Sequence, residues 1–254
     1  MLRIALGLVF LGAAALLQDE KKGPPPDPKP RIAMALPLGV TPGSTTKVTL
    51  RGQNLDQATE VKFSLPIEGG SVAIKGKGKA EIPKETDPAV YGDTKVDLEV
   101  KLPPEVSAVS LVAVNAAGET KPHELVVLPK EQLVQEKEPN GGFSTAQPLE
   151  SGQVVQGVVS QALDVDVFKF TGKKGETWLV EVEAHRRGSI LDAMLTIYDS
   201  AGHTLAVADD SASSRDPSIK LALPADGTYF VALMDAHNTG GSTHVYLLRL
   251  RRDN

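Results

Sequence analysis

Residues 164–170 read DVDVFKF, and this alternation of polar and apolar residues is typical of a β-strand. Because successive side chains on a strand point to opposite faces, Asp164, Asp166, Phe168 and Phe170 are expected to share one face. The strand begins with carboxylates and ends with aromatic rings. We therefore expect its first residues at the rim of a sheet and its last residues in a core.

Residues 131–254 contain further runs of this kind, separated by turn residues. Short strands at near-regular spacing predict an antiparallel β-sandwich of the jelly-roll kind. Trp178 is the only tryptophan, and its place in an alternating run predicts a core position rather than a ligand-stacking surface. The eight candidate strands are VVQGVVS, DVDVFKFT, ETWLVEVEA, AMLTIYD, TLAVAD, SIKLAL, GTYFVALM and HVYLLRLR.

The first half shows the same period of two from residue 32 to residue 128. Its runs are bounded by Gly, Pro and Asn, which favours a second β-sandwich, and no stretch predicts a helix. The basic KGKGK at 75–79 is interpreted as a solvated hairpin tip, and RLRR at 249–252 as a frayed tail. The candidate strands are KVTLRG, EVKFSL, SVAIKG, KVDLEVKL, SLVAVN and ELVVL.

The N-terminus indicates export. Residues 1–18 combine one basic residue, an unbroken apolar run and small residues, which is the pattern of a signal peptide; a retained N-terminal anchor is the alternative. Residues 19–30 contain KKGPPPDPKP and predict an extended, proline-rich tether. No later segment has the roughly 18 continuous apolar residues that a membrane span needs. The mature chain is therefore expected to be secreted, periplasmic or at the cell surface, without a membrane span.

Composition and charge divide the chain further. Residues 31–130 carry 12 basic and 12 acidic residues, and residues 131–254 carry 11 and 17, a net charge of −6. Nucleic-acid binding needs clustered Lys and Arg, so we expect no nucleic-acid partner. There is no cysteine, which excludes disulfides and thiolate chemistry. The predicted domains are a first sandwich at 31–129, a linker at 130–142 and a second sandwich at 136–254.

The sequence offers no recognisable catalytic arrangement. Its five histidines are scattered without the HExxH spacing, and no GxSxG elbow, P-loop or GxGxxG motif occurs. A carboxylate pair for glycoside hydrolysis could be drawn from the acidic residues of the second half, but these fall in turns, where Asp bonds its own backbone. We therefore predict that the chain is not an enzyme. The acidic residues in question are Asp192, Asp199, Asp209 and Asp210.

The first half resembles the IPT/TIG family. The resemblance rests on PLGVTPGSTTKVTLRGQNLDQATEVKF, which begins at Pro37, and on the closing VKLPPEVSAVSLVAVNAAGETKPHELVVL. It implies an immunoglobulin-like sandwich and no catalytic residues. Members of that family are usually spacers or binding modules on exported proteins.

The second half resembles the bacterial pre-peptidase C-terminal domain, or PPC domain. Five motifs occur in the family's order across residues 136–251: EKEPN, DVDVFKF, LDAMLTIYDSAG, ADD and ADGTYFVAL. PPC domains typically accompany secreted peptidases. The fold implied for the whole chain is all-β, with an immunoglobulin-like and then a jelly-roll-like sandwich.

The resemblance also implies a metal site. Related collagen-binding domains of secreted bacterial collagenases bind calcium with their EKEPN-like segment and their DxD strand. The matching residues here are Glu136, Glu138, Asn140, Asp164 and Asp166. One position departs from the calcium-binding pattern, because Gly141 stands where an Asp is often found. The other interpretation is a solvated linker followed by a turn.

Two classes of function remain. The first is an exported, non-catalytic binding or adhesion protein that calcium would stabilise, whose partner is a surface polysaccharide, a surface protein or a secreted hydrolase. The alternative is a small secreted hydrolase or an accessory subunit of a secreted peptidase. The absence of a nucleophile–base arrangement from the sequence argues against the hydrolase, and activity of the purified mature chain against peptide and glycan substrates would decide between the two classes.

Overall fold

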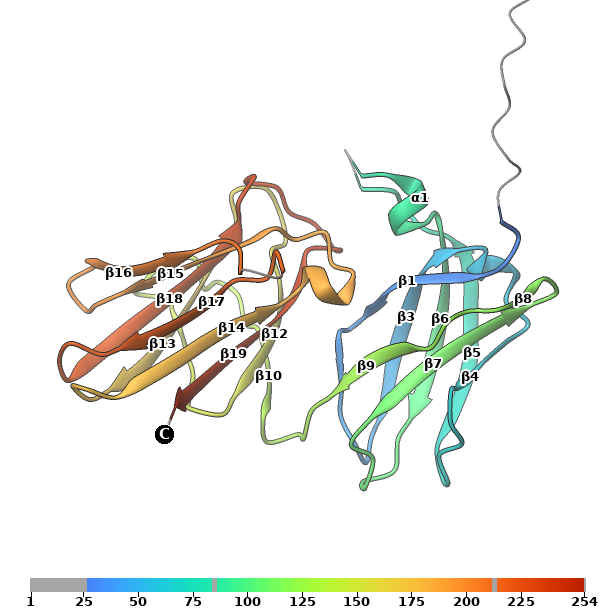
Figure 1. Ribbon diagram of the computed structural model, residues 1–254, viewed down its shortest axis with the longest axis horizontal. Helices are drawn as coiled ribbons and strands as arrows, with labels where there is room; N and C mark the ends of the chain where they lie inside the picture. Colours follow the sequence, from blue (N-terminus) through green and yellow to red (C-terminus); the bar gives the residue numbers. More distant parts are fainter. Residues whose placement is uncertain (1–26, 84–85, 212–213, 254) are drawn as a thin grey trace, which may run out of the picture.

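The computed structural model describes residues 27–83, 86–211 and 214–253. Over these residues the chain is almost entirely β and forms two sandwiches side by side, which confirms the predicted fold class (Figure 1). The predicted signal peptide and the tether up to residue 26 lie outside the described part. None of the helices that the structure describes is long and apolar enough to cross a membrane.

The first sandwich consists of two sheets that face each other. One sheet has the strand order β1-β3-β6-β5, and the other has the order β2-β9-β7-β4 with β8 paired to β7. Apolar residues between the sheets, such as Leu50, Leu98 and Leu111, form one core. The strands are β1 (Arg31–Leu36), β2 (Gly39–Val40), β3 (Thr45–Gln53), β4 (Glu60–Phe63), β5 (Ser71–Lys79), β6 (Thr94–Lys101), β7 (Val109–Asn115), β8 (Gly118–Glu119) and β9 (His123–Val127), and the short helix η1 is Leu55–Gln57.

The sequence predicted a hairpin tip for the KGKGK segment, and this prediction is wrong. It forms the second half of β5, an edge strand that pairs with β6 across a register shift between Ile74 and Gly76. Its lysines are exposed, while the glycines between them are half-buried. Lysine on an edge strand disfavours pairing with other chains, which explains a basic run in this place.

A short helix, α1 (Pro88–Tyr91), was not predicted. Asp87 caps it, because the amide of Ala89 donates to the Asp87 carboxylate at 2.8 Å, and Pro88 occupies the first helical position. Asp followed by Pro is a known helix start, so the signal was in the sequence. The helix lies at the end of the first sandwich that faces the second one (Figure 1).

The second sandwich also has two sheets. Their strand orders are β10-β12-β19-β14-β17 and β11-β13-β18-β15-β16. All eight strands predicted for this half are present. The strands are β10 (Leu133–Gln135), β11 (Gln147–Pro148), β12 (Val154–Val158), β13 (Val165–Gly172), β14 (Thr177–Glu183), β15 (Ala193–Tyr198), β16 (Thr204–Ala208), β17 (Ser218–Ala222), β18 (Gly227–Asp235) and β19 (Val245–Asp253), and the short helix η2 is His185–Arg187.

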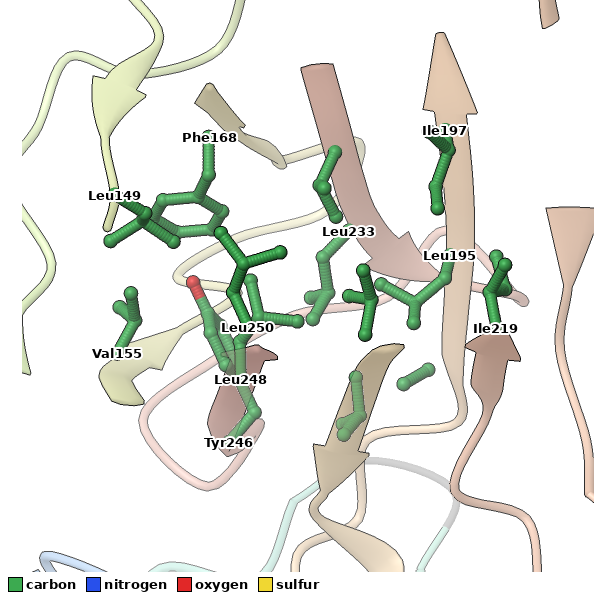
Figure 2. Packing of buried hydrophobic residues seen from close by; sticks show 14 of the residues in the cluster. Leu149, Val155, Phe168, Leu195, Ile197, Ile219, Leu233, Tyr246, Leu248 and Leu250 are labelled. Carbon is green, nitrogen blue, oxygen red and sulfur yellow. The ribbon is translucent and has the colours of Figure 1, made fainter. Parts of the chain in front are cut away.

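The aromatic end of DVDVFKF lies in the core of the second sandwich, as predicted, and Asp166, which was expected at the rim, is buried with it. Asp166, Phe168 and Phe170 are all buried, and Trp178 packs against Phe170 with ring centroids 4.5 Å apart. Figure 2 shows Phe168 and the Tyr246 ring within the same apolar cluster. The polar start of β13 and the hydroxyl of Tyr246 thus lie at the edge of a well-packed core.

The RLRR segment is not a frayed tail. It lies in β19, which pairs with β14 and β12 in the middle of its sheet. Arg249 Nε donates to Glu183 at 2.6 Å, and Arg252 Nη1 donates to Glu176 at 2.8 Å. The arginines therefore balance acidic residues of the neighbouring strand.

The two sandwiches touch through a small apolar cluster, called here the interdomain cluster. Two backbone contacts accompany it: the Gly39 amide donates to Gln156 Oε1 at 2.8 Å, and Gly188 lies so close to the Ala33 carbonyl that a Cβ there would be 2.1 Å from its oxygen. These contacts place β1 and β2 against β12, β19 and η2. The interdomain cluster consists of Leu38, Val126, Leu128, Val154 and Leu247.

Candidate metal centre

The linker reaches the second sandwich as paired backbone. Strand β10 runs parallel to β12, and the Glu136 amide continues the pairing by donating to the Gln156 carbonyl at 3.1 Å. Gln147 fixes the next residues, because it donates to the Gln135 carbonyl at 3.0 Å and accepts from the Lys137 amide at 2.8 Å. The positions of residues 135–137 are therefore set by hydrogen bonds.

Three carboxylates gather where this linker crosses the start of β13. Glu136, Glu138 and Asp166 each present an oxygen, and these oxygens lie within 4.8 Å of one another. Asp166 is fully buried, Glu136 is half-buried and Glu138 is exposed. The buried carboxylate thus comes from the strand, and the accessible ones come from the linker. We call Glu136, Glu138, Asn140 and Asp166 the acidic cluster.

Tyr246 and Gly157 also shape this site, and the sequence analysis did not identify either. The Tyr246 hydroxyl lies 2.8 Å from Asp166 Oδ2 and 3.0 Å from Glu136 Oε1. A Cβ at residue 157 would be 2.3 Å from that hydroxyl, so only glycine leaves room for the tyrosine. A glycine inside the strand VVQGVVS was the available signal, since such glycines often mark a close approach.

Asn140 joins the linker to β13. Its amide donates to Glu138 Oε2 at 2.8 Å, its side-chain Nδ2 donates to Glu136 Oε1 at 3.0 Å, and its carbonyl accepts from the Val167 amide at 3.1 Å. The residue is fully buried. Asn140 therefore orients both glutamates while its own backbone is held by the strand.

Two buried oxygens of the acidic cluster are unsatisfied. Among the described residues, neither Oδ1 of Asn140 nor Oδ1 of Asp166 has a hydrogen-bond partner. A buried polar atom without a partner costs about 1–3 kcal/mol. Asn140 Oδ1 is an acceptor, and Asp166 Oδ1 is an acceptor when the carboxylate is ionised, so a cation or a hydrogen-bond donor would satisfy both.

The protonation of Asp166 follows from its surroundings. Burial, together with the hydrogen bond and the like charge of the nearby Glu136 carboxylate, raises the pKa of Asp166 to about 9. Without a cation, Asp166 therefore holds a proton at neutral pH. A bound divalent cation would favour the ionised carboxylate, because an opposite charge stabilises the charged form.

Asp164 is placed differently from the other four predicted ligands. Its Oδ2 accepts from the Ser160 amide at 2.7 Å and from the Ser160 hydroxyl at 2.8 Å, so it closes a turn. Strand alternation does not extend to this residue, because β13 begins at Val165 and Leu163 has a positive φ of 66°. Asp164 is thus outside the group of carboxylates that lie within 4.8 Å.

The donor set fits a hard cation. Calcium takes six to eight oxygen ligands, and the acidic cluster offers carboxylate and amide oxygens only. Glu136, Glu138 and Asp166 would hold the ion, with Asn140 Oδ1 beside them. The rim has space for a further ligand: a Cβ at Gly141 would lie 3.5 Å from the Val165 carbonyl oxygen, an ordinary contact.

The other acidic residues considered from sequence do not form a pair. The Asp199 carboxylate accepts from the amides of Ala201 and His203, each at 2.9 Å, and Asp209 accepts from the Asp210 amide at 2.8 Å. These are the turn-forming roles that the sequence predicted. Asp192 lies elsewhere, in a cleft between the two sandwiches.

Comparison with known proteins identifies part of the second sandwich. Residues 164–233 match the family model of the bacterial pre-peptidase C-terminal domain. A probable subtilase-type serine protease of Deinococcus radiodurans is 38% identical over 99 residues, which are 37% of this chain and 13% of the protease. The chain thus spans about an eighth of that relative. The match to the IPT/TIG family stays a prediction.

Solved structures show distant similarity in fold. The pre-peptidase C-terminal domain of a collagenase from Bacillus anthracis is 12% identical, covers 42% of this chain and 94% of that one, and has a TM-score of 0.33. PliG of Aeromonas hydrophila, a periplasmic inhibitor of g-type lysozyme, is 13% identical, covers 48% and 98%, and has a TM-score of 0.34. On the strength of the family model, the second sandwich carries a bacterial pre-peptidase C-terminal domain.

Proposed function

We propose that this chain is an exported, non-catalytic accessory or binding protein whose linker is locked onto the second sandwich by calcium. The observation that carries the proposal is the pair of buried oxygens, Asn140 Oδ1 and Asp166 Oδ1, that have no partner among the described residues. They lie beside two glutamates in a site whose possible metal ligands are all oxygen atoms. Calcium would satisfy both oxygens at once.

The accessory role is supported by the type of protein in which the matched sequence occurs. The matched relative is a protease, and the matched stretch is a small part of it. We propose that this chain supplies a similar module as a separate polypeptide, with a secreted hydrolase, a surface protein or a surface polysaccharide as its partner. Its proposed location is outside the cytoplasm, at the cell surface, in the periplasm or in the medium.

Calcium would act on the joint between the domains. Glu136 and Glu138 belong to the linker, whereas Asp166 belongs to β13. A cation held by all three would fix the linker to the sandwich and thereby restrict the motion of the first sandwich relative to the second. A module that presents a binding surface would bind its partner more tightly as a result, because less conformational entropy is lost when the partner binds.

Thermal unfolding in calcium and in chelator tests the proposal. A ligand at a hundred times its Kd stabilises the folded state by about 2.7 kcal/mol. For a domain of about 120 residues the midpoint should rise by about 10 °C. Asp166→Asn should abolish the rise, because it removes the buried anionic oxygen while keeping the shape of the side chain.

Two variants serve as controls for that experiment. Asp164→Asn should leave the rise intact, because the Asp164 carboxylate serves the turn at Ser160 rather than the acidic cluster. Glu150→Gln, on the exposed surface, should leave it intact as well. An unchanged midpoint of the wild-type chain in millimolar calcium would refute the metal site and leave the acidic linker as a solvated joint.

A further inference from the structure

A hollow lies on the outer face of the sheet β11-β13-β18-β15-β16, and we call it the outer hollow. Its volume of about 370 Å³ is within the range of about 300–1,000 Å³ that small-molecule sites occupy. The sheet lies on the side of the second sandwich that is farther from the first one (Figure 1). The residues that line the outer hollow are Pro148, Leu149, Lys169, Phe170, Thr171, Ser200, Thr228 and Phe230.

Phe230 forms an aromatic wall of the outer hollow. It points outward from β18, because its neighbours Tyr229 and Val231 are buried in the core and successive side chains alternate between faces. Phe230 is paired with Lys169 of β13 on one side and with Tyr198 of β15 on the other. The Cβ atoms of directly opposite residues are about 4.5–5.5 Å apart. The lysine, the phenyl ring and the phenol ring therefore lie in one row across the sheet.

Phe143 extends this aromatic surface. Its ring stacks on Phe230, with centroids 4.3 Å apart and an angle of 16° between the planes, and its centroid lies 5.2 Å from that of Tyr198, which meets it edge to face. Phe143 is nevertheless 39% exposed. One face of a pyranose sugar carries C–H groups that pack well against a flat aromatic ring, so this surface suits a sugar.

The charge of the outer hollow is positive. Of the described residues that line it, Lys169 alone is charged, and its ammonium group forms no ion pair with any described residue. The carboxylate nearest in sequence to Ser200 is that of Asp199, which is already bound by the amides of Ala201 and His203 and by the His203 ring. The net charge of −6 on residues 131–254 is spread over the sandwich and screened beyond about 8 Å at physiological ionic strength. The local ammonium group therefore favours an anionic ligand.

Three hydroxyl groups accompany this ammonium group. They belong to Thr171, Thr228 and Ser200, and the two threonines are directly paired, two residues along the strands from Lys169 and Phe230. Within the part of the chain that the structure describes, none of these hydroxyls takes part in a side-chain hydrogen bond. Each can both donate and accept, as the hydroxyls of a sugar can. The outer hollow thus combines an aromatic wall, free hydroxyls and one cation.

From this arrangement we propose that the outer hollow binds a uronic acid unit of an acidic polysaccharide. The sugar ring would lie against Phe230 and Phe143, its carboxylate would pair with the Lys169 ammonium group, and its hydroxyls would bond to the three hydroxyls of the lining. The inference rests on the proposed binding role and gives the surface polysaccharide a chemical class. It does not depend on calcium, because the acidic cluster shares no residue with the described lining.

Isothermal titration calorimetry of the full chain with trigalacturonic acid and with trimannuronic acid tests the proposal. We expect saturable binding of at least one of the two acids, with NMR shifts at the amides of Thr171 and Thr228. The methyl ester of that acid has the same rings without the charge and should bind about tenfold more weakly. No saturable binding of either acid, or equal binding of acid and ester, would overturn the proposal.

These titrations are made in chelator, because uronic acids bind calcium themselves. Their outcome is then separate from that of the calcium site, which is measured as a rise of the thermal midpoint without any sugar. A chain that binds the acid but shows no midpoint rise would keep the sugar site and lose the metal site. A chain with a midpoint rise that binds neither acid would keep the metal site and lose the sugar site.

Lysine variants test the charge. Lys169→Gln keeps most of the length of the side chain, and it should weaken binding of the acid about tenfold while leaving binding of the ester unchanged. Lys220→Gln is the matched control, because Lys220 lies on β17 of the other sheet and pairs with Asp253. It should bind like the wild-type chain. If Lys169→Gln also binds the acid like wild type, Lys169 is not a ligand and the proposal is wrong.

Phe143→Leu tests the aromatic surface. It removes the flat ring and keeps an apolar side chain, so it should weaken binding of acid and ester alike, by about fivefold. Unchanged binding of both would show that no sugar ring lies on Phe143 and would overturn the proposed arrangement.

An acidic peptide is the competing occupant. Acetyl-Gly-Glu-Gly-amide carries a carboxylate but has neither a sugar ring for the aromatic wall nor hydroxyls for the lining, so it should show no saturable binding in the same titration. Binding of this peptide as tightly as the uronic acid would mean that the outer hollow selects a carboxylate alone, which would overturn the proposal in favour of an acidic peptide.

Discussion

Two aspartates of the second sandwich, Asp166 and Asp235, are almost equally buried and behave in opposite ways. Asp166 is 0% exposed and Asp235 is 2% exposed. They lie on the adjacent, antiparallel strands β13 and β18, at the same end of one sheet. Yet the pKa of Asp166 is raised to about 9, and the pKa of Asp235 is lowered.

The difference comes from their neighbours. Asp235 accepts hydrogen bonds from three amides and one hydroxyl, which stabilise its negative charge. Asp166 has the Tyr246 hydroxyl as a donor, and it faces the like charge of Glu136. Burial therefore does not by itself mark a binding site; a buried carboxylate that lacks donors does. Asp235 shapes a loop, whereas Asp166 belongs to the site that we propose for a cation.

Replacing the two aspartates one at a time tests this comparison, and it is the test for which we expect the largest effect. Asp235→Ala leaves several donors of the 235–244 loop unsatisfied, and we expect it to lower the free energy of unfolding by about 3 kcal/mol. Asp166→Asn in chelator removes a carboxylic acid that must take up a proton on folding at pH 7, so it should raise the free energy of unfolding rather than lower it. Urea unfolding at pH 7 measures both. Equal costs would mean that the two carboxylates have the same role.

The pH dependence of stability should sharpen the contrast. Asp166 has a folded pKa above the unfolded value of about 3.9, so its contribution is full below that pH and is lost as the pH rises toward 9. Asp235 has a lowered pKa, so its contribution is present above about pH 4 and is lost in acid.

The measurement is urea unfolding between pH 5 and pH 9 in chelator. The lower limit lies about one pH unit above the pKa of Asp166 in the unfolded chain, and the upper limit is the pKa of Asp166 in the folded chain. Relative to Asp166→Asn, the wild-type chain should lose up to about 1.4 kcal/mol per pH unit. Saturating calcium should flatten this slope, because the ion stabilises the ionised carboxylate. A wild-type slope equal to that of the variant would contradict the raised pKa.

The smallest expected effect concerns the donor to Asp166. Tyr246→Phe removes the hydroxyl and keeps the ring, so we expect a loss of about 1 kcal/mol in chelator. Tyr229→Phe is a matched control in the same core, because its hydroxyl donates to the Ala225 carbonyl at 2.6 Å, away from the acidic cluster. Only Tyr246→Phe should change the calcium-dependent midpoint rise. An equal change in both variants would remove Tyr246 from the site.

The strands of the second sandwich could be predicted because its alternation is regular and its turns are rich in glycine and aspartate. Four of the five predicted ligands, Glu136, Glu138, Asn140 and Asp166, lie together in the structure. The resemblance assigns both aspartates of the DxD strand to the metal, and alternation places them on one face, but β13 begins only at Val165. Sequence periodicity cannot say where a strand begins when the preceding turn also contains polar residues.

Other features required information that a single sequence does not hold. Tyr246 reaches the acidic cluster from β19 and lies 110 residues after Glu136 in the sequence. The local sequence pattern predicts only that Tyr246 is a core residue, which it also is. The cleft depends on how two sandwiches sit against each other, which no local pattern records. The lysines of β5 looked like a turn because of their glycines, whereas pairing with β6 decided their conformation.

The hydrogen-bonded linker should make the chain more resistant to proteolytic cleavage between its two domains. A protease cuts most readily where an exposed segment can leave its partners and enter an active site, and domain joints are usual targets. Here β10 pairs with β12, Gln147 holds both sides of Glu136, and Asn140 is buried against β13. The joint between the two sandwiches is therefore expected to be a poor substrate for proteases.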